Sequence, residues 1–180
     1  DILDVFFPAP KASLSGPSAD ALRAVSGTLD DAALSSLAKD CRAANDEPTA
    51  ALAERLRDSG RRVVASTLTE DQAPQAVEDA YLKLHMLSHR LVKPHGTDLS
   101  GIFPLLPNVA WTDEGPVDLS ELADRQLTAR LQGRVLAVAS VDKFTKMTNY
   151  VVPSGVRIDH SARVRLVAPL GAGTTGLHEG

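Results

Sequence analysis

The sequence predicts an α/β (α+β) N-terminal domain at residues 1–148, followed at residues 149–180 by the first coil or coils of a left-handed parallel β-helix. Strand and helix patterns alternate over the first part of the chain, as in domains that layer helices on a sheet. From Val152 onward, aliphatic residues recur every six positions, which is the signature of β-helical coils. Only 4% of the residues are aromatic, and this favours helices packed on a sheet over an aromatic-rich sandwich.

The composition narrows the class of protein. A chain of 180 residues that is 43% hydrophobic can bury one sizeable core. The net charge of −4 argues against general nucleic-acid binding. No apolar run approaches the ~20 residues that span a bilayer, and the acidic start is unlike a signal peptide. The chain does not begin with methionine, so we expect it to be trimmed at its front. The single cysteine, Cys41, predicts a cytoplasmic protein and a buried side chain more than a reactive thiol.

The first part of the chain reads as strand, two helices and strand. Residues 2–7 predict a short strand that ends at Pro8. Asp30 and Asp31 could cap a helix through residue 45, and a second helix is expected at residues 47–57, before Gly60. Residues 62–69 alternate like a strand.

The strongest helical pattern covers residues 75–92, before Pro94. Its apolar stripe has spacings of three and four, and consists of Val77, Ala80, Tyr81, Leu84, Leu87, Ser88 and Leu91. Residues 108–112 then predict a strand. A helix is expected from Asp118 to its end at Gly133, with apolar residues at Leu119, Leu122, Ala123, Leu127 and Leu131. The almost continuously apolar residues 135–141 predict a buried strand.

The six-residue repeat predicts the β-helix. Its aliphatic positions, expected to point inward, are Val152, Ile158, Val164 and Leu170; small or β-branched residues follow four positions later, at Val156, Ala162, Ala168 and Thr174. Three hexads complete a turn, so Val152 should stack under Leu170. The alternative is two ordinary strands, residues 150–158 and 163–168. Repeat folds need several stacked units, so we expect either further coils after residue 180 or a partner that covers this end.

Several motifs in the same order resemble one family, the tetrahydrodipicolinate N-succinyltransferases of the actinobacterial type. They are residues 79–92, 94–96, 101–103, 108–112, 115–116, 141–144, 150–158, 163–166, 173–175 and 178–180. The resemblance is weakest at residues 11–60. It implies a homotrimer of left-handed β-helices, with active sites between subunits. It also implies succinyl transfer from succinyl-CoA to an amino group of a dicarboxylate acceptor in lysine and diaminopimelate synthesis.

The resemblance also implies what lies outside this chain. The family's catalytic glutamate and coenzyme A groove belong to later coils, beyond Gly180, so we expect the 180-residue chain alone to be inactive. A divalent ion such as Mg²⁺ near the trimer axis would be held by a glutamate, matched by Glu179, and an aspartate. Ala162 occupies the aspartate position, which leaves too few oxygen ligands.

Several histidines and charged residues have both a functional and a purely structural interpretation. His85 and His89 have the spacing of two metal ligands, with His95 as a third, but fit boundary histidines with hydrogen bonds or a subunit contact better. Lys143, Lys146, Arg157, Arg163 and Arg165 either attract an anionic substrate or are exposed charges that prevent aggregation. Arg157 and Lys143 are the candidates for substrate binding. Glu179 is a metal ligand, an arginine partner or an exposed residue, and Trp111 is expected in the core or an interface rather than under a substrate.

Three functions are therefore open. The first is an N-succinyltransferase whose catalytic coils follow this chain. The second is a non-catalytic truncated paralogue that acts as a trimer scaffold or partner subunit. The third is a hexapeptide acyltransferase with another acceptor, against which the motifs at residues 141–144 and 150–153 argue.

Overall fold

The computed structural model describes residues 2–176, and contacts divide the chain into two compact units. Unit 1 consists of residues 1–10 and 71–180, and unit 2 of residues 11–70. The boundary expected at residue 148 lies inside unit 1. That boundary marks a change of sequence repeat, which a division by contacts does not test.

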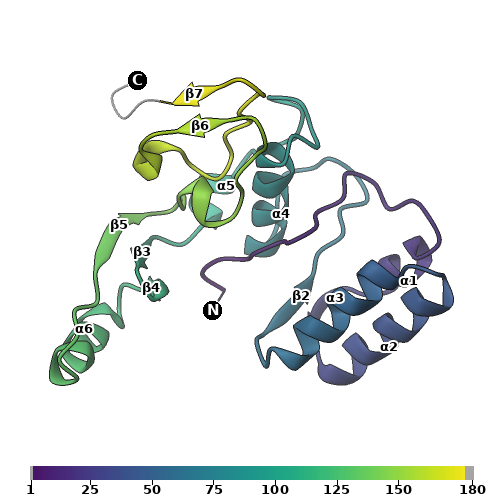
Figure 1. Cartoon of the computed structure of the whole chain (residues 1–180), viewed down its shortest axis with the longest axis horizontal. Coiled ribbons are helices and arrows are strands. Elements are labelled where there is room, and N and C mark those ends of the chain that lie inside the picture. Colours follow the sequence, from purple (N-terminus) through teal and green to yellow (C-terminus); the bar gives the residue numbers. More distant parts are fainter. Residues whose placement is uncertain (1, 177–180) are drawn as a thin grey trace. The chain divides into compact units, whose positions relative to one another are not determined.

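Unit 2 is a helical hairpin with a small sheet (Figure 1). Its elements are α1 (Ala19–Arg23), β1 (Gly27–Leu29), α2 (Asp31–Ala43), α3 (Glu47–Asp58) and β2 (Val63–Ala65). The two expected helices are confirmed, because each begins with an aspartate that accepts a backbone hydrogen bond: Asp30 from Ala33 N and Asp46 from Thr49 N. The expected strand shortens to β2, which pairs antiparallel with β1.

The core of unit 2 is made of small side chains. Cys41 and Ala50 are fully buried between α2 and α3, with Leu37, Ala38 and Ala53 beside them. Burial raises the pKa of the Cys41 thiol. The expectation of a buried small residue is confirmed at Cys41.

Unit 1 is built around α4 (Val77–Ser88), with α5 (Ile102–Leu105) in contact with it. A three-stranded antiparallel sheet has the order β4-β3-β5, with β3 (Val109–Thr112), β4 (Gly115–Asp118) and β5 (Val138–Asp142). The helix α6 (Leu122–Leu131) lies between β4 and β5 in the chain. The remaining elements are η1 (Met147–Asn149), β6 (Arg157–Ile158), η2 (Ser161–Arg163) and β7 (Thr175–Gly176).

The core of unit 1 joins α4, β3 and the coil region. Its buried residues include Tyr81, Leu84, Val109, Met147 and Leu166. Trp111 is 5% exposed and donates its indole N–H to Asp142 O at 2.9 Å. The expectation that Trp111 is a core residue is therefore confirmed.

Residues 2–7 are not a strand, contrary to the sequence prediction. No strand pairs with them; they pack instead on the core through Leu3, Val5 and Phe7. Phe7 N donates to His85 Nε2 at 3.3 Å, and Tyr150 donates its hydroxyl hydrogen to Asp4 Oδ2 at 2.5 Å. The alternating apolar residues of this segment therefore pack against the core around α4 instead of forming one face of a sheet.

The predicted helix from Asp118 is shorter and differently buried. Asp118 ends β4, opposite Val109, and α6 begins only at Leu122. Its apolar positions are largely exposed, at 40% for Leu119, 57% for Leu127 and 80% for Leu131. Residues 135–141 are also not a buried strand: β5 is an edge strand on which Val141 is 51% exposed.

The coil region pairs as the six-residue repeat predicts, with one exception. β6 and β7 are parallel, with Arg157 opposite Thr175 and Ile158 opposite Gly176, an offset of eighteen residues (Figure 1). Ile158, Val164 and Leu170 pack against the core. Val152 does not point inward: it is 70% exposed, because Val151 takes the buried position at the end of η1.

Candidate functional site

Two arginines of the coil region have exposed side chains. Arg157 is exposed on β6, and Arg163 is exposed at the end of η2. Neither guanidinium forms a hydrogen bond or ion pair with any described residue. Lys146 lies opposite Arg165 in an antiparallel bridge, where two like charges repel.

The other two residues of the predicted basic cluster already have partners. Arg165 forms an ion pair with Asp142 at 2.7 Å and donates to Ala162 O at 2.6 Å. Lys143 donates to Leu106 O at 2.6 Å and lies 5.2 Å from the centre of the Phe103 ring. The structure therefore separates the cluster into fixed cations and cations that are open to an anion.

Backbone hydrogen bonds fix the corner of the coil beside Arg157. Gly155 has a φ of 71°, a conformation that favours glycine, and its carbonyl accepts from Gly173 N at 2.7 Å. Arg157 N donates to Thr174 O at 2.9 Å. Arg157 thus lies on a short strand that is fixed by hydrogen bonds to the segment before β7 and to β7 itself.

Arg90 connects this corner to α4. It follows the helix with a φ of 62°, unusual for a residue with a side chain, and its N–H donates to Leu87 O in the helix-ending turn. Its guanidinium donates to Leu170 O at 2.6 Å and Ser154 O at 2.9 Å. The predicted helix therefore ends at Ser88 instead of residue 92. The Arg90 side chain connects two segments of the coil region, one at Ser154 and the other at Leu170.

A cavity of about 390 Å³ lies between the end of α4, the loop that follows it and the coil region. It is lined by Leu87, by Pro94, His95, Thr97, Asp98 and Leu99 of the following loop, and by Val167 and Pro169. The lining is mainly apolar. His95 contributes an imidazole at its edge from a backbone with a φ of 58°.

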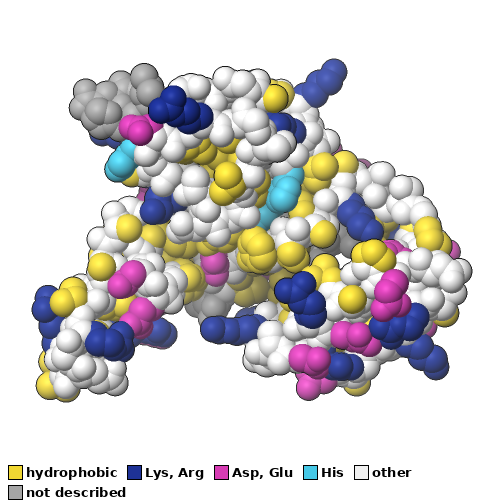
Figure 2. Space-filling model, in the orientation of Figure 1, with side chains coloured by type: hydrophobic (Ala, Val, Ile, Leu, Met, Phe, Trp, Pro, Cys, Tyr) yellow, Lys and Arg dark blue, Asp and Glu magenta, His cyan; other side chains and the backbone are white. Residues whose placement is uncertain are grey.

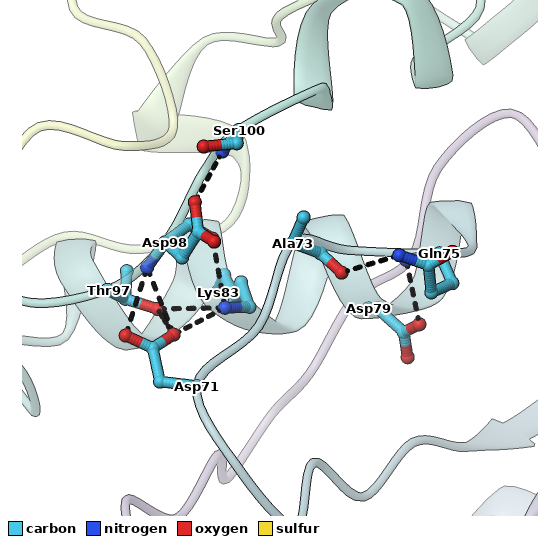
Figure 3. Close-up of polar contacts among 8 residues, drawn as sticks. All are labelled: Asp71, Ala73, Gln75, Asp79, Lys83, Thr97, Asp98 and Ser100. Atoms are coloured by element: carbon cyan, nitrogen blue, oxygen red, sulfur yellow. Dashed lines mark hydrogen bonds and ion pairs between the residues drawn. The ribbon is translucent and has the colours of Figure 1, made fainter.

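A buried lysine anchors the loop beside the cavity. Lys83 is 1% exposed, and its ammonium donates to Asp71 Oδ1 at 2.6 Å, Thr97 Oγ1 at 3.2 Å and Asp98 O at 2.9 Å (Figure 3). The hydrogen bonds that the Asp71 carboxylate accepts from Lys83, from the amide of Asp98 and from the Thr97 hydroxyl lower its pKa to about 2. Because all three ammonium hydrogens have acceptors, Lys83 positions the loop and has no hydrogen left for a ligand.

The two helix histidines do not form a metal site with His95. His85 is fully buried; its Nδ1 lies 2.8 Å from Tyr81 O, and its Nε2 accepts from Phe7 N. Burial lowers the pKa of His85 to about 4 and also lowers that of His89. Within the described part of the chain, no three His, Cys, Asp or Glu side chains gather as metal ligands would. The prediction of boundary histidines is wrong for His85, which is fully buried, although its hydrogen bonds are present; His89 Nε2 is buried and has no hydrogen-bond partner among the described residues.

The expected ion site does not fit the residues that are described. Ala162 lies in η2 and has no side-chain oxygen, and Glu179 lies outside the described residues. A hard cation needs several oxygen ligands, so no step is assigned to a metal.

Sequence similarity and structural similarity point to the same family. The family model described as tetrahydrodipicolinate N-succinyltransferase middle matches residues 106–145. A protein of Pseudomonas putida named 2,3,4,5-tetrahydropyridine-2,6-dicarboxylate N-succinyltransferase is 53% identical over 189 residues, which span 99% of this chain and 54% of that protein. The chain belongs to the tetrahydrodipicolinate N-succinyltransferase family. The resemblance expected from the motifs is thereby confirmed.

Two further members of this succinyltransferase group support the assignment. A Pseudomonas paraeruginosa protein of the same name is 64% identical over 135 residues, which span 75% of this chain and 39% of that protein. A solved Campylobacter jejuni structure, described as a 2,3,4,5-tetrahydropyridine-2-carboxylate N-succinyltransferase, has a TM-score of 0.73 and 31% identity, covering 83% of this chain and 41% of its own. The chain spans about half the length, or less, of these relatives.

Lys83 and Arg90 are the two important polar residues that sequence reasoning missed. Lys83 interrupts the apolar run Leu82-Lys83-Leu84 in the best helix of the chain, which was a signal for a buried charge. Arg90 had no such signal, because its acceptors lie 64 and 80 residues away.

Proposed function

We propose that this chain is part of an N-succinyltransferase that moves a succinyl group from succinyl-CoA to an amino group of a tetrahydropyridine dicarboxylate acceptor in lysine and diaminopimelate synthesis. The family membership carries this proposal, together with the names of the relatives. Within it, residues 1–148 form the N-terminal domain and residues 149–180 begin a left-handed β-helix. The parallel pairing of β6 and β7 at an eighteen-residue offset supports that assignment, since three hexads make one coil.

The proposal includes a homotrimer in the cytoplasm. Every helix within residues 2–176 is too short or too polar to traverse a bilayer. One coil also leaves open strand edges, which association would cover.

In the proposed enzyme, Arg157 attracts the carboxylates of the acceptor or the phosphates of coenzyme A. Its guanidinium is exposed and has no partner among residues 2–176, which supports this role. Lys143 donates one ammonium hydrogen to Leu106 O, which leaves two hydrogens with which it would contribute to the same site. In the transfer, the acceptor nitrogen attacks the thioester carbonyl, a base takes the amine proton, and the thiolate of coenzyme A leaves.

The test is a chimera. The chain replaces the matching part of the Pseudomonas putida relative, and coenzyme A release is measured with succinyl-CoA and tetrahydrodipicolinate. We expect turnover by the chimera and none above background by the 180-residue chain alone. In the chimera, Arg157→Gln should raise KM roughly tenfold for one of the two substrates, because a charge-assisted bond is worth about 1.5–3 kcal/mol. Arg23→Gln, in unit 2, is the matched control.

The second candidate function is a non-catalytic scaffold or partner subunit. Ala162 favours it, because an ion position that the resemblance implies has lost its aspartate. A folded chimera that releases no coenzyme A would reject the enzyme and support the scaffold.

A further inference from the structure

The strand that carries Arg157 is short and has little support of its own. β6 and β7 form a two-stranded sheet, and each strand has two residues. A two-stranded sheet is marginal in water and needs packing from other elements. Ile158 packs against the core, but Ser154 and Gly155, which lead into β6, are exposed. The position of the corner before Arg157 therefore depends on contacts with the rest of unit 1.

The end of α4 supplies such contacts. Ser88, the last residue of α4, is buried, and its Oγ accepts a hydrogen bond from Val167 N at 3.1 Å. Two residues later, Arg90 donates from Nε to Leu170 O and from Nη2 to Ser154 O. Most of α4 is buried in the core, and a helix places the groups attached to it more firmly than a loop does. The coil region is therefore fastened to a rigid element.

The two acceptors of Arg90 belong to the two segments that pair with each other. Ser154 O lies three residues before Arg157, in the segment that leads into β6. Leu170 O lies in the segment that leads into β7, four residues before Thr174, whose carbonyl accepts from Arg157 N at 2.9 Å. A guanidinium is planar and presents its N–H groups in a fixed geometry. Arg90 therefore fixes the two segments relative to each other as well as to α4.

Arg157 depends on its backbone for the position of its charge. Its guanidinium is exposed and has no hydrogen-bond or ion-pair partner among residues 2–176. Figure 2 shows basic side chains at the surface of the coil region, where β6 and β7 are labelled in Figure 1. A displacement of a binding group by about 1 Å weakens its interaction strongly, because hydrogen bonds tolerate little change in length and angle. Where Arg157 meets an anion therefore follows from where β6 lies.

We propose that Arg90 is a positioning residue for Arg157 in substrate binding. It holds the corner at Ser154 and the returning segment at Leu170, so that β6 presents Arg157 to the anionic group of the substrate. Arg90 acts through the backbone of the coil and does not itself bind the substrate. The inference rests on the proposed succinyl transfer and on the role of Arg157 in it.

The experiment is a double-mutant cycle in the chimera with the Pseudomonas putida relative. kcat and KM are measured for succinyl-CoA and for tetrahydrodipicolinate with the unsubstituted chimera, Arg90→Gly, Arg157→Gln and the double variant. Glycine suits the φ of 62° at position 90, so Arg90→Gly removes the guanidinium and keeps the end of the helix. Asn45→Gly in unit 2 is the matched control, because it also replaces a residue of positive φ, 59°, by glycine.

We expect Arg90→Gly to raise KM about threefold to tenfold for the substrate that Arg157→Gln affects, a change of the size that such cycles find for linked residues. kcat should change by less than about twofold, since a loss of binding alone raises KM. In the Arg157→Gln background, Arg90→Gly should change KM by less than about twofold, because no guanidinium is left to position. Asn45→Gly should match the unsubstituted chimera.

The outcomes separate this inference from the proposed function. An unchanged KM in Arg90→Gly overturns the inference and leaves the succinyl transfer standing. An equal rise of KM in both backgrounds also overturns it, because Arg90 then acts without Arg157. An unchanged KM in Arg157→Gln overturns it as well, since Arg157 then binds neither substrate. A chimera without turnover rejects the proposed function, and this inference with it.

Discussion

At the scale of single residues, the buried charge of Lys83 governs the loop that lines the cavity. Its partner Asp71 has a side chain that is 54% exposed, so water can solvate the carboxylate but not the ammonium. Removing one partner of a buried pair is costly when the charge that remains is the buried one. The two members of this ion pair should therefore respond unequally to substitution.

We expect Asp71→Asn to destabilise unit 1 by about 3 kcal/mol, because it leaves a buried ammonium without its counter-ion. Lys83→Met removes the buried charge and should cost about 1–2 kcal/mol through lost hydrogen bonds. Urea unfolding followed by the fluorescence of Trp111 measures both. If Lys83→Met is the more damaging change, the ammonium is not the dominant buried charge.

His85 makes the stability of unit 1 depend on acid pH. Its pKa is lowered to about 4 by burial, whereas an exposed histidine titrates near 6.5. Between these values the unfolded chain binds a proton that the folded chain excludes, so stability falls as the pH drops from about 6.5 to 4. His89, whose pKa burial also lowers, acts in the same direction.

We expect the loss from pH 7.5 to pH 4 to be on the order of 3 kcal/mol for His85. His85→Gln should flatten this dependence while lowering stability at neutral pH. Urea unfolding of unit 1 at several pH values tests it, with His160→Gln as a control at an exposed histidine. An equal slope in wild type and His85→Gln would show that His85 is not the responsible group.

At the scale of elements, the sequence predicted those whose cause is local. Helices α2, α3 and α4 follow from capping aspartates and from spacings of three and four, and all three are confirmed. The prediction of a strand at residues 2–7 was wrong, because a strand must pair with another strand and the local sequence pattern does not show whether such a partner exists. The pattern gave the apolar positions of α6 correctly, but it did not show that Leu127 and Leu131 are exposed.

The candidate site also contains features with a local cause, which were predictable, and features that depend on distant residues, which were not. The eighteen-residue offset between β6 and β7 was predictable, because it equals three units of the six-residue repeat in the sequence. Pairings such as Arg165 with Asp142 were not, because they join residues of separate elements. The sequence could therefore propose a basic cluster, but only the structure shows which cations are open.

Arg90 connects α4 to the coil, and Arg90→Gly separates its two roles. Glycine fits the φ of 62° better, so a purely helix-ending role predicts equal or higher stability. The loss of the guanidinium should instead release Ser154 O and Leu170 O, and speed hydrogen exchange at the amides of Gly173 and Thr174 at least tenfold, for about 1.4 kcal/mol of local stability. Arg62→Gly, in unit 2, is the control. Unchanged exchange in the coil would assign Arg90 to the helix end alone.

At the scale of the whole molecule, the two units have different kinds of core. Unit 1 buries Tyr81, Trp111, Met147 and several leucines, whereas unit 2 buries Cys41 among alanines and Leu37. Large side chains contribute more stabilisation per residue than alanine does. Unit 2, residues 11–70, also contains residues 11–60, where the resemblance to the family motifs is weakest. This agrees with a separate module that has its own core.

The chain carries one natural probe in each unit, because its only tryptophan, Trp111, is in unit 1 and its only cysteine, Cys41, is in unit 2. We expect urea to expose Cys41 to a thiol reagent at a lower midpoint than the one at which Trp111 fluorescence changes. The reason is that the alanine-rich core of unit 2 buries less apolar surface. Ala50→Gly should lower the Cys41 midpoint and leave that of Trp111 in place, and Ala80→Gly should do the reverse. Coincident midpoints that move together in both variants would show that the chain unfolds as one cooperative body.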